Sequence, residues 1–318
     1  NTPERDIERE LVIIVVGETA RAGNFSLNGY ERKTNPLLEK EKSLVSYDNF
    51  TSCGTSTSIS VPCMFSFSDR ESFDVNSSRQ TQNVLDVLAL AGVNILWRDN
   101  NSDSKGVAER LEYQSYRSPK INTICDTECR DVGMLVGLQE YIDRQDKDVL
   151  IVLHQMGSHG PAYYKRYPKD FEKFTPVCQS NELSECTKEE IVNAYDNTIL
   201  YTDYFLSEVI KFLKHNDKKY ETAMLYISDH GESLGENGLY LHGMPYFMAP
   251  KEQISVPFIA WVGKSSDLDY EKIEKIASIK NNHDAFAQAI LAAFEVKTDL
   301  LFDAKKDELL KSKKQHDY

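Results

Sequence analysis

Carboxylate and imidazole side chains follow two apolar runs of the sequence, at the points where those runs end. Glu18 comes after residues 11–16, and the neighbouring pair Asp229 and His230 comes after residues 223–228. Oxygen and imidazole ligands of this kind hold zinc in catalytic sites, where one coordination position stays open. Any one of these residues alone would more often be a helix cap, a surface charge or a hydrogen-bonded core histidine. Their convergence on one edge of a sheet would instead predict a metal centre.

Further polar side chains follow the other apolar runs. They are Asn101 and Lys105 after residues 93–97, His154 and His159 after residues 149–153, and Glu232 and His242 beyond the Asp-His pair. With His230 and the more weakly supported His283, five of the seven histidines would gather at one edge of the sheet. Ligands of open parallel sheets bind beyond the carboxyl ends of the strands, so we expect a functional site there.

A hydroxyl-rich segment between Cys53 and Cys63 could supply a nucleophile. It contains two threonines and three serines, and its composition alone would suit a flexible loop. A disulfide at its ends and a helix behind it would instead hold one hydroxyl at a helix N-terminus, which favours anions. A metal-bound hydroxyl is also much more acidic than a free one. Spacing leaves open which hydroxyl acts, and the residues alone predict a metal-dependent hydrolase or transferase acting on an anionic group.

Short apolar runs predict the strands that position these side chains: residues 11–16, 93–97, 149–153, 223–228 and 256–262. Their nearly continuous apolar character is typical of a parallel sheet covered on both faces. Helices are predicted at residues 79–91, ending at Gly92, and from a capping box at residues 187–190 to about residue 215. The alternation predicts an α/β sandwich, with a mostly parallel central sheet and helices on both faces. Without an internal repeat or a Pro- or Gly-rich linker, a single domain over residues 1–318 is expected.

The six cysteines form three pairs that are close in sequence and never have C-x-x-C spacing: Cys53 and Cys63, Cys125 and Cys129, Cys178 and Cys186. This arrangement favours disulfides over metal ligands. Disulfides persist in a periplasm or outside the cell, so an extracytoplasmic location is favoured over six reduced cysteines in a cytosolic enzyme.

The composition excludes several classes of protein. Hydrophobic residues make up 41% and charged residues 27%, as in ordinary globular proteins. The formal net charge of −13 argues against a nucleic-acid partner, which would require a basic face. No apolar run approaches the roughly 18 residues needed to span a bilayer, and the charged start NTPERDIERE is not a signal peptide. A soluble acidic globular protein is expected.

Four segments together resemble the lipid A phosphoethanolamine transferases, most closely the mobile and intrinsic colistin-resistance members. They are VVGETARAGNFSLNGYERKTNP (residues 15–36), CGTSTSISVPCMFS (53–66), HQMGSHGPAYYKRYP (154–168) and SDHGESLGENGLYLHG (228–243). The resemblance implies an alkaline-phosphatase/sulfatase-like fold. Full-length members carry an N-terminal transmembrane domain, so this chain is expected to be the soluble catalytic domain, a monomer at the periplasmic face of the inner membrane.

The same resemblance implies a role for each candidate residue. Thr57 would be the nucleophile, and one tightly bound zinc ion would be held by Glu18, Thr57, Asp229 and His230. His159 and His242 match positions for a second metal or for the substrate phosphate, with Asn101, Lys105 and Glu232 assisting at the substrate. Thr57, His159, His242, Glu232 and Lys105 would be catalytic, and the three cysteine pairs match the disulfides of the family.

The implied reaction is a two-step transfer. Thr57 would take phosphoethanolamine from phosphatidylethanolamine, and a lipid A phosphate would then receive it, which would reduce the binding of cationic polymyxins such as colistin. Alternatives are a phosphatase, phosphodiesterase or sulfatase of the same superfamily, or a non-catalytic zinc-binding extracytoplasmic domain. A sulfatase would have a Cys or Ser nucleophile followed by C-x-P-S-R-like residues, and no arginine closely follows Thr57.

Overall fold

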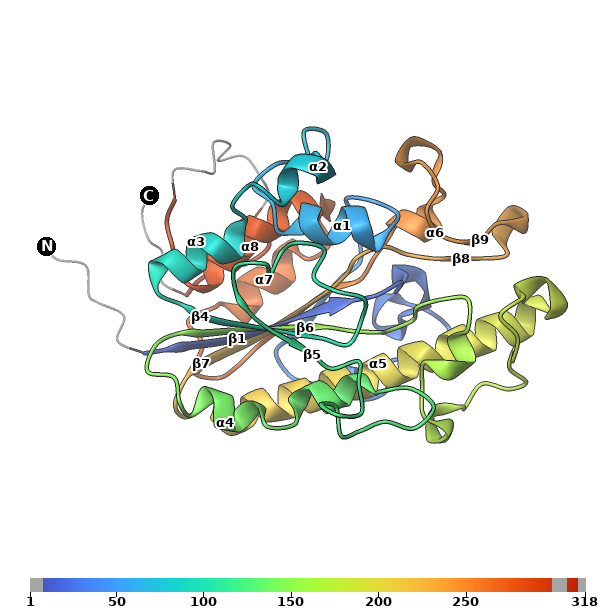
Figure 1. Ribbon diagram of the computed structural model, residues 1–318, viewed down its shortest axis with the longest axis horizontal. Helices are drawn as coiled ribbons and strands as arrows, with labels where there is room; N and C mark the ends of the chain where they lie inside the picture. Colours follow the sequence, from blue (N-terminus) through green and yellow to red (C-terminus); the bar gives the residue numbers. More distant parts are fainter. Residues whose placement is uncertain (1–7, 299–307, 314–318) are drawn as a thin grey trace, which may run out of the picture.

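A seven-stranded sheet forms the centre of the molecule in the computed structural model, which describes residues 8–298 and 308–313. The sheet lies between two layers of helices (Figure 1), and its strand order is β2-β10-β7-β1-β6-β4-β5. The seven strands span these residues: β1 Glu10–Gly17, β2 Leu44–Tyr47, β4 Asn94–Asp99, β5 Glu112–Ser115, β6 Val149–His154, β7 Glu221–Ser228 and β10 Phe258–Val262. All five predicted strands are present, and a mostly parallel sheet is confirmed.

Strand β10 is the exception to the parallel arrangement. It runs antiparallel to both β7 and β2, whereas β1, β4, β5, β6 and β7 pair in parallel. The chain leaves β7 at its carboxyl end, passes through α6 (Lys251–Ile254) and returns directly into β10. Since no crossover segment carries it back to the amino end of the sheet, the next strand has to run in the opposite direction.

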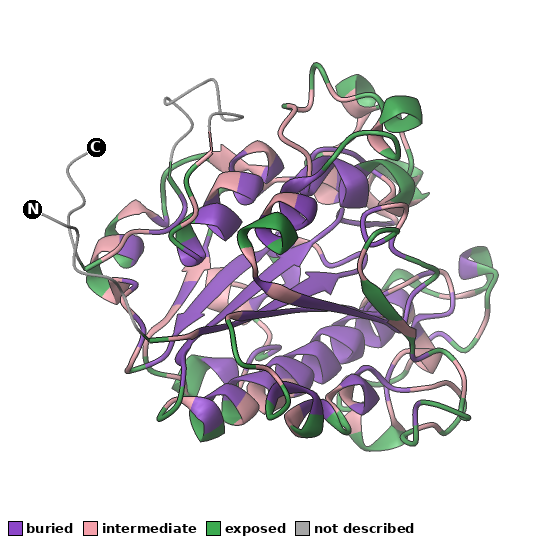
Figure 2. Cartoon of the chain, turned by 60° about the vertical axis from the view of Figure 1, so that its left-hand side comes forward, coloured by how far each residue is buried: buried purple, intermediate pink, exposed green. Residues whose placement is uncertain are grey.

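Helices cover both faces of the sheet. On one face lie α1 (Thr57–Met64), α2 (Val75–Ser78), α3 (Val84–Ala91), α7 (Tyr270–Ile276) and α8 (Phe286–Ala293), and on the other lie α4 (Leu138–Ile142) and α5 (Lys188–Asn216). Alternate residues of β1 enter the two cores, Val12 and Ile14 on the first face and Leu11 and Ile13 on the second. Figure 2 shows the sheet buried between the layers, which explains why its strands are apolar throughout.

Capping side chains set the limits of the main helices. Thr187 and Glu190 form the expected capping box of α5. The predicted helix at residues 79–91 begins only at Val84, because the Asn83 side chain accepts hydrogen bonds from the backbone N–H groups of Leu85 and Asp86 and so starts the helix there. Gly92 ends it in a left-handed conformation, as expected.

The remaining elements are short. Strand β3 (Phe50–Thr51) pairs in parallel with β11 (Asn281–Asn282), and β8 (Ser233–Leu234) pairs antiparallel with β9 (Tyr240–Leu241). Turns of 3₁₀ helix occupy Ala22–Asn24, Ser26–Asn28, Leu38–Lys40, Asp131–Leu135, Tyr163–Lys165, Lys169–Phe171, Leu183–Glu185, Glu236–Gly238, Tyr246–Met248 and His283–Ala285. Disulfides join the three expected cysteine pairs. Within the described ranges, every helix is too short or too polar to cross a membrane.

Candidate metal centre and active site

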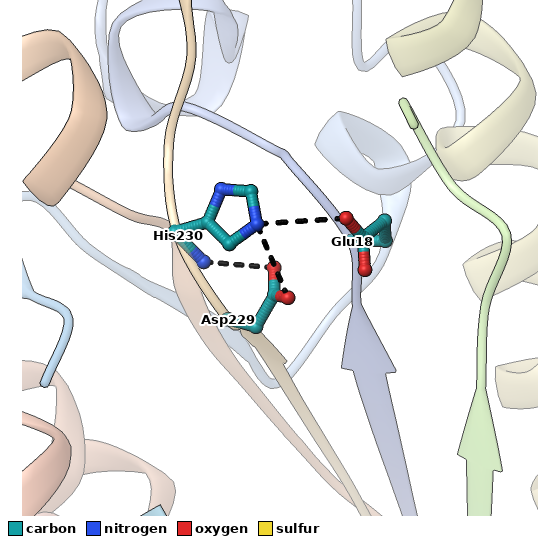
Figure 3. Close-up of side chains that lie close together, drawn as sticks. All are labelled: Glu18, Asp229 and His230. Atoms are coloured by element: carbon teal, nitrogen blue, oxygen red, sulfur yellow. Dashed lines mark hydrogen bonds and ion pairs between the residues drawn. The ribbon is translucent and has the colours of Figure 1, made fainter. Parts of the chain in front are cut away.

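The register of the sheet brings the carboxyl ends of neighbouring strands together. Gly17 of β1 lies opposite Ser228 of β7, so the residues that follow them, Glu18 and Asp229, emerge side by side. With His230 they form a group whose potential ligand atoms all lie within 4.8 Å of one another (Figure 3). All three side chains are buried. The predicted convergence of these residues at one edge of the sheet is confirmed.

The orientation of the His230 ring suits metal binding. Its Nδ1 lies 2.8 Å from the Gly231 carbonyl oxygen and must donate to it, which leaves Nε2 as the free nitrogen in the neutral ring. Nε2 lies 3.5 Å from Glu18 Oε1 and 3.4 Å from Asp229 Oδ2. Asp229 Oδ2 is buried and has no hydrogen-bond partner. A cation between these atoms would satisfy that oxygen.

The charges of the site also favour a bound cation, because two buried carboxylates need a compensating positive charge. Burial disfavours the imidazolium, but the Asp229 and Glu18 carboxylates outweigh it and raise the pKa of His230 to about 10. Burial also opposes ionisation of Glu18, yet the hydrogen bond and charge of His230 hold the pKa of Glu18 well below its usual range. A divalent cation could replace this proton as the counter-charge, and the three residues therefore fit a metal with oxygen and nitrogen ligands.

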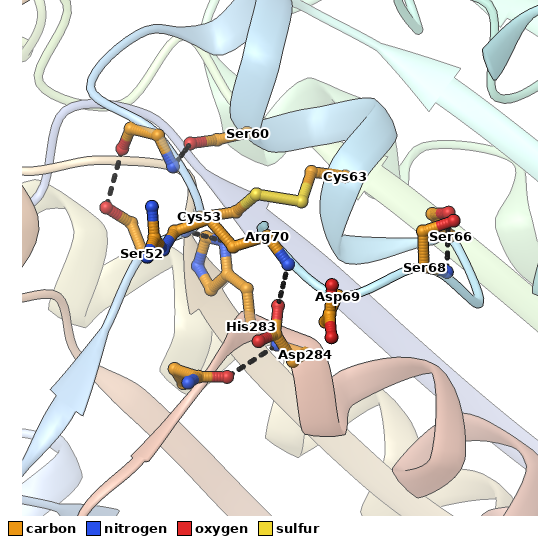
Figure 4. Close-up of a disulfide and its surroundings, with 12 residues drawn as sticks. Ser52, Cys53, Ser60, Cys63, Ser66, Ser68, Asp69, Arg70, His283 and Asp284 are labelled. Carbon is orange, nitrogen blue, oxygen red and sulfur yellow. Dashed lines mark hydrogen bonds between the residues drawn. A yellow bond between two sulfur atoms is a disulfide. The ribbon is translucent and has the colours of Figure 1, made fainter. Parts of the chain in front are cut away.

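The hydroxyl of Thr57 lies beside this group. Thr57 is the first residue of α1, after the N-cap Ser56. Its Oγ1 donates to Glu18 Oε2 at 3.0 Å and lies 3.4 Å from His230 Nε2. The preceding segment is tied to the helix by the Cys53–Cys63 disulfide (Figure 4). Of the hydroxyls in this loop, Thr57 is thus the one that contacts the Glu18-Asp229-His230 group.

Thr19 links the two carboxylates and was not identified from the sequence. Its backbone N–H donates to Asp229 Oδ1 at 3.0 Å, and its hydroxyl donates to Glu18 Oε1 at 2.7 Å. These contacts require a left-handed backbone with φ of 59°, which is costly for a β-branched residue. The position of a threonine directly after Glu18 was the only available signal, and it is too common to identify a role.

Asn101 holds Glu18 from the opposite side. Its side-chain amide donates to Glu18 Oε2 and to the Gln155 carbonyl oxygen, both at 2.8 Å. Both amide hydrogens are therefore engaged within the protein. The residue is buried, and its backbone N–H donates to Asp99 Oδ1 at 2.9 Å.

His154, like Asn101, forms its contacts in the interior beneath the site. Its Nδ1 lies 2.8 Å from Asp99 Oδ2, which also accepts a hydrogen bond from Trp97 Nε1 at 2.9 Å. All three side chains are buried. The sequence placed His154 at the correct edge but did not reveal Asp99 as its partner, because that contact depends on the register of β4 and β6.

His242 faces the group from the segment beyond β9. Its ring centroid lies 4.1 Å from that of His230, and its Nδ1 lies 2.9 Å from Glu232 Oε1. The other oxygen of Glu232 accepts a hydrogen bond from the Tyr163 hydroxyl at 2.8 Å. Glu232 is fully buried, whereas a quarter of the His242 side chain is exposed. Tyr163 was another residue missed from the sequence, where it lies 69 positions from its partner.

His159 and Lys105 are the remaining two candidate residues. The charge of His159 also contributes to the lowered pKa of Glu18, after the larger effect of His230, and its buried Nδ1 lacks a hydrogen-bond partner. The Lys105 ammonium lies 3.4 Å from Asp103 Oδ1. The structure thus associates His159 electrostatically with the central group and pairs Lys105 with Asp103.

Comparisons with known proteins identify relatives of this chain. Phosphatidylethanolamine transferase Mcr-1 of Escherichia coli is 51% identical over 301 residues, which cover 92% of this chain and 55% of that protein. Phosphoethanolamine transferase EptA of Escherichia coli K12 is 47% identical, over 85% of this chain and 48% of that protein. The chain therefore spans about half the length of these relatives.

This chain covers nearly the whole length of two solved structures. The soluble domain of lipooligosaccharide phosphoethanolamine transferase A from Neisseria meningitidis is 40% identical, with a TM-score of 0.87 over 93% of this chain and 90% of that chain. The C-terminal periplasmic domain of phosphoethanolamine transferase EptC from Campylobacter jejuni is 44% identical, with a TM-score of 0.85 over 95% and 96%. The expected alkaline-phosphatase/sulfatase-like fold is confirmed. Since the sulfatase profile also matches residues 10–296, the chain belongs to the sulfatase family, and within it is similar to the phosphoethanolamine transferases.

Proposed function

We propose that this chain is a single catalytic domain that transfers phosphoethanolamine from phosphatidylethanolamine to a lipid A phosphate. The observation that carries the proposal is the contact of the Thr57 hydroxyl with the Glu18-Asp229-His230 group. A threonine hydroxyl beside a set of metal ligands suits a covalent intermediate. The similarity to transferases that are named for phosphoethanolamine supports this choice of group.

Zinc is the metal we propose, held by Glu18, Asp229, His230 and the Thr57 oxygen. When bound, it would lower the pKa of the coordinated hydroxyl and stabilise negative charge on the phosphoryl group. Asn101 and Thr19 would hold Glu18 in place, since both donate to its carboxylate. A second ion near His159 and His242 is an alternative to direct roles of these two histidines at the substrate.

In the first step Thr57 Oγ1, whose proton would be released to solvent when the metal binds, forms a bond to phosphorus. The bond from phosphorus to the diacylglycerol oxygen breaks, and that oxygen keeps the electron pair. A proton from His242 would neutralise the leaving alkoxide. Glu232 suits His242 to this role, because it accepts the Nδ1 hydrogen bond and so directs Nε2 away from itself.

The second step reverses the roles. An oxygen of the lipid A phosphate passes its proton to His242 and attacks the phosphorus, and the bond to Thr57 Oγ1 breaks with the electron pair left on Oγ1. His159 would stabilise the phosphoryl oxygens through its positive form. Lys105 would do the same after leaving Asp103, and Asn101 would act on the substrate only through Glu18.

Substrates have room beside the Thr57 helix. A cavity of 610 Å³ lies next to it, lined among others by Ser56, Ile59, Val75 and Tyr246. Ser56 directly precedes the proposed nucleophile, whereas Thr57 itself does not line the cavity. We place the protein as a monomer at the periplasmic face of a Gram-negative inner membrane, attached through a transmembrane part, where its product would confer polymyxin resistance.

The test is mass spectrometry of the protein after incubation with zinc and a short-chain phosphatidylethanolamine, with Thr57→Ala as the control. We expect phosphoethanolamine on Thr57 in the wild type and none in the variant or after chelation. A bare phosphate on Thr57 would identify a phosphatase instead. If no adduct forms although zinc is bound, the same measurement on the membrane-attached protein separates a non-catalytic zinc domain from one that requires its membrane part.

A further inference from the structure

We infer that His283 is a positioning residue that fixes the segment carrying Thr57 against the strand carrying Asp229 and His230. The inference rests on the proposed function, which makes Thr57 the nucleophile and Asp229 and His230 metal ligands. The hydrogen bonds of His283 do not depend on that assignment. Its two hydrogen bonds in the described structure go to Cys53 and Ser228, and not to Thr57 or the metal-binding group. Its ring lies beside Cys53 (Figure 4) and is buried to 1% exposure.

The His283 ring forms hydrogen bonds with both segments. The backbone N–H of Cys53 donates to His283 Nδ1 at 3.0 Å. His283 Nε2 lies 3.0 Å from the Ser228 carbonyl oxygen, which can only accept a hydrogen bond. The tautomer is therefore fixed as neutral imidazole with its proton on Nε2. Burial favours this form and lowers the pKa of His283 to about 3.

Each partner of the ring is rigidly joined to the site. Cys53 is bound through its disulfide to Cys63 in α1, the helix that begins with Thr57. Gly54 adds a second link to the same helix, because its N–H donates to Ser60 Oγ at 2.9 Å. A shift of Cys53 would thus be transmitted to the start of α1.

The link from Ser228 to the metal-binding residues is equally short. Ser228 directly precedes Asp229, and its hydroxyl donates to the His230 carbonyl oxygen at 3.1 Å. The same hydroxyl accepts a hydrogen bond from the backbone of Ala20 at 2.9 Å. His283 thus bonds to a residue that also contacts the segment that follows Glu18.

The local chain places the ring between these partners. Strand β11 pairs in parallel with β3, with Asn282 opposite Thr51, so the next residue, His283, reaches the start of the Cys53 loop. The Asn282 side chain caps the following turn. A residue that merely fills this space would need only the right shape, whereas the two hydrogen bonds require an acceptor and a donor about as far apart as the two ring nitrogens.

The proposal is tested with His283→Leu, which loses both hydrogen bonds, and His283→Gln, which keeps one acceptor and one donor. Leu213→Ala in α5 is the matched control, because it opens the core on the opposite face of the sheet. Hydrogen exchange is measured in peptides covering residues 53–64 and 226–231, and zinc affinity by competition with a chelator. Adduct formation on Thr57 is measured separately.

We expect His283→Leu to speed exchange in both peptides and to weaken zinc binding about tenfold, the lower range for residues that support metal ligands. His283→Gln should restore most of the affinity. Leu213→Ala should lower the melting temperature and leave zinc affinity unchanged. Equal zinc affinity in His283→Leu and wild type, with a lowered melting temperature, would reduce His283 to a structural residue and overturn the proposal.

Two further outcomes are distinguishable. If His283→Leu does not fold, His283→Asn decides: it keeps an acceptor near the Nδ1 position and loses the bond to Ser228, so weaker zinc binding supports the proposal and unchanged binding overturns it. If the wild type forms no adduct but the exchange and zinc results hold, the proposed reaction fails while the positioning role stands.

Discussion

Removal of the Asn101 amide should weaken metal binding without any change to a metal ligand. In Asn101→Ala, Glu18 Oε2 and the Gln155 carbonyl oxygen each lose a donor at 2.8 Å in a buried environment. A hydrogen bond to a charged group contributes about 1.5–3 kcal/mol and a neutral one about 1 kcal/mol, so the folded chain should lose about 2.5–4 kcal/mol. Loss of a residue that orients a metal ligand typically weakens metal affinity about 10–100-fold.

Asn100→Ala provides a matched control. Asn100 is the preceding residue and is equally buried, but its amide donates to the Cys129 carbonyl oxygen and to Asp131. Competition with a chelator measures zinc affinity, and thermal melts of the metal-free proteins measure stability. Both variants should melt earlier, and only Asn101→Ala should lose zinc affinity.

Two results would refute this reasoning. Equal loss of affinity in both variants would mean that general destabilisation, and not the hold on Glu18, weakens the metal. An unchanged affinity in Asn101→Ala together with a raised KM for the lipid donor would assign Asn101 directly to the substrate, as the resemblance implied.

Three other predictions can be checked independently. Tyr163→Phe removes one hydrogen bond from the buried Glu232 carboxylate and should slow adduct formation severalfold, up to about tenfold; an unchanged rate would separate Tyr163 from the reaction. Replacing both cysteines of the Cys53–Cys63 pair by alanine opens a loop with a sequence separation of 10 and should lower the free energy of unfolding by about 2.7 kcal/mol, measured as a lower urea midpoint. The pKa of His283 is about 3 in the folded state and about 6.5 in the unfolded state, so the unfolded state binds the proton first. Each pH unit below about 6.5 should therefore cost about 1.4 kcal/mol of stability, down to pH 3, and His283→Gln should show a correspondingly flatter urea midpoint over that range.

Much of the candidate site could be predicted because its potential metal ligands follow strands directly. Glu18 and the Asp229-His230 pair needed only the positions of β1 and β7, since parallel strands end at the same edge. The capping box of α5 was equally local, because its two members lie three residues apart. Patterns of short range in the chain were sufficient for these features.

The supporting residues could not be predicted, because their contacts depend on register and on side-chain direction. His154 pairs with Asp99 only because the two lie opposite each other in β6 and β4. Tyr163 reaches Glu232 from a segment with no strand of its own. Lys105 was expected to assist at the substrate on grounds of resemblance, and this stays a prediction; its ammonium lies 3.4 Å from Asp103 Oδ1 in this structure.

The antiparallel direction of β10 has a consequence for how this enzyme scaffold can vary. Since the chain does not cross the sheet between β7 and β10, residues 229–257 all remain at the carboxyl edge. The two ends of this excursion are joined at its base, where the N–H groups of Gly231 and Glu232 donate to the Gln253 and Glu252 carbonyl oxygens at 2.9 and 2.7 Å. Insertions or deletions beyond this base that keep His242 against the His230 ring would leave Asp229 and His230 undisturbed. The excursion is thus a region whose length can vary around His242 while Glu18, Asp229, His230 and the sheet stay the same.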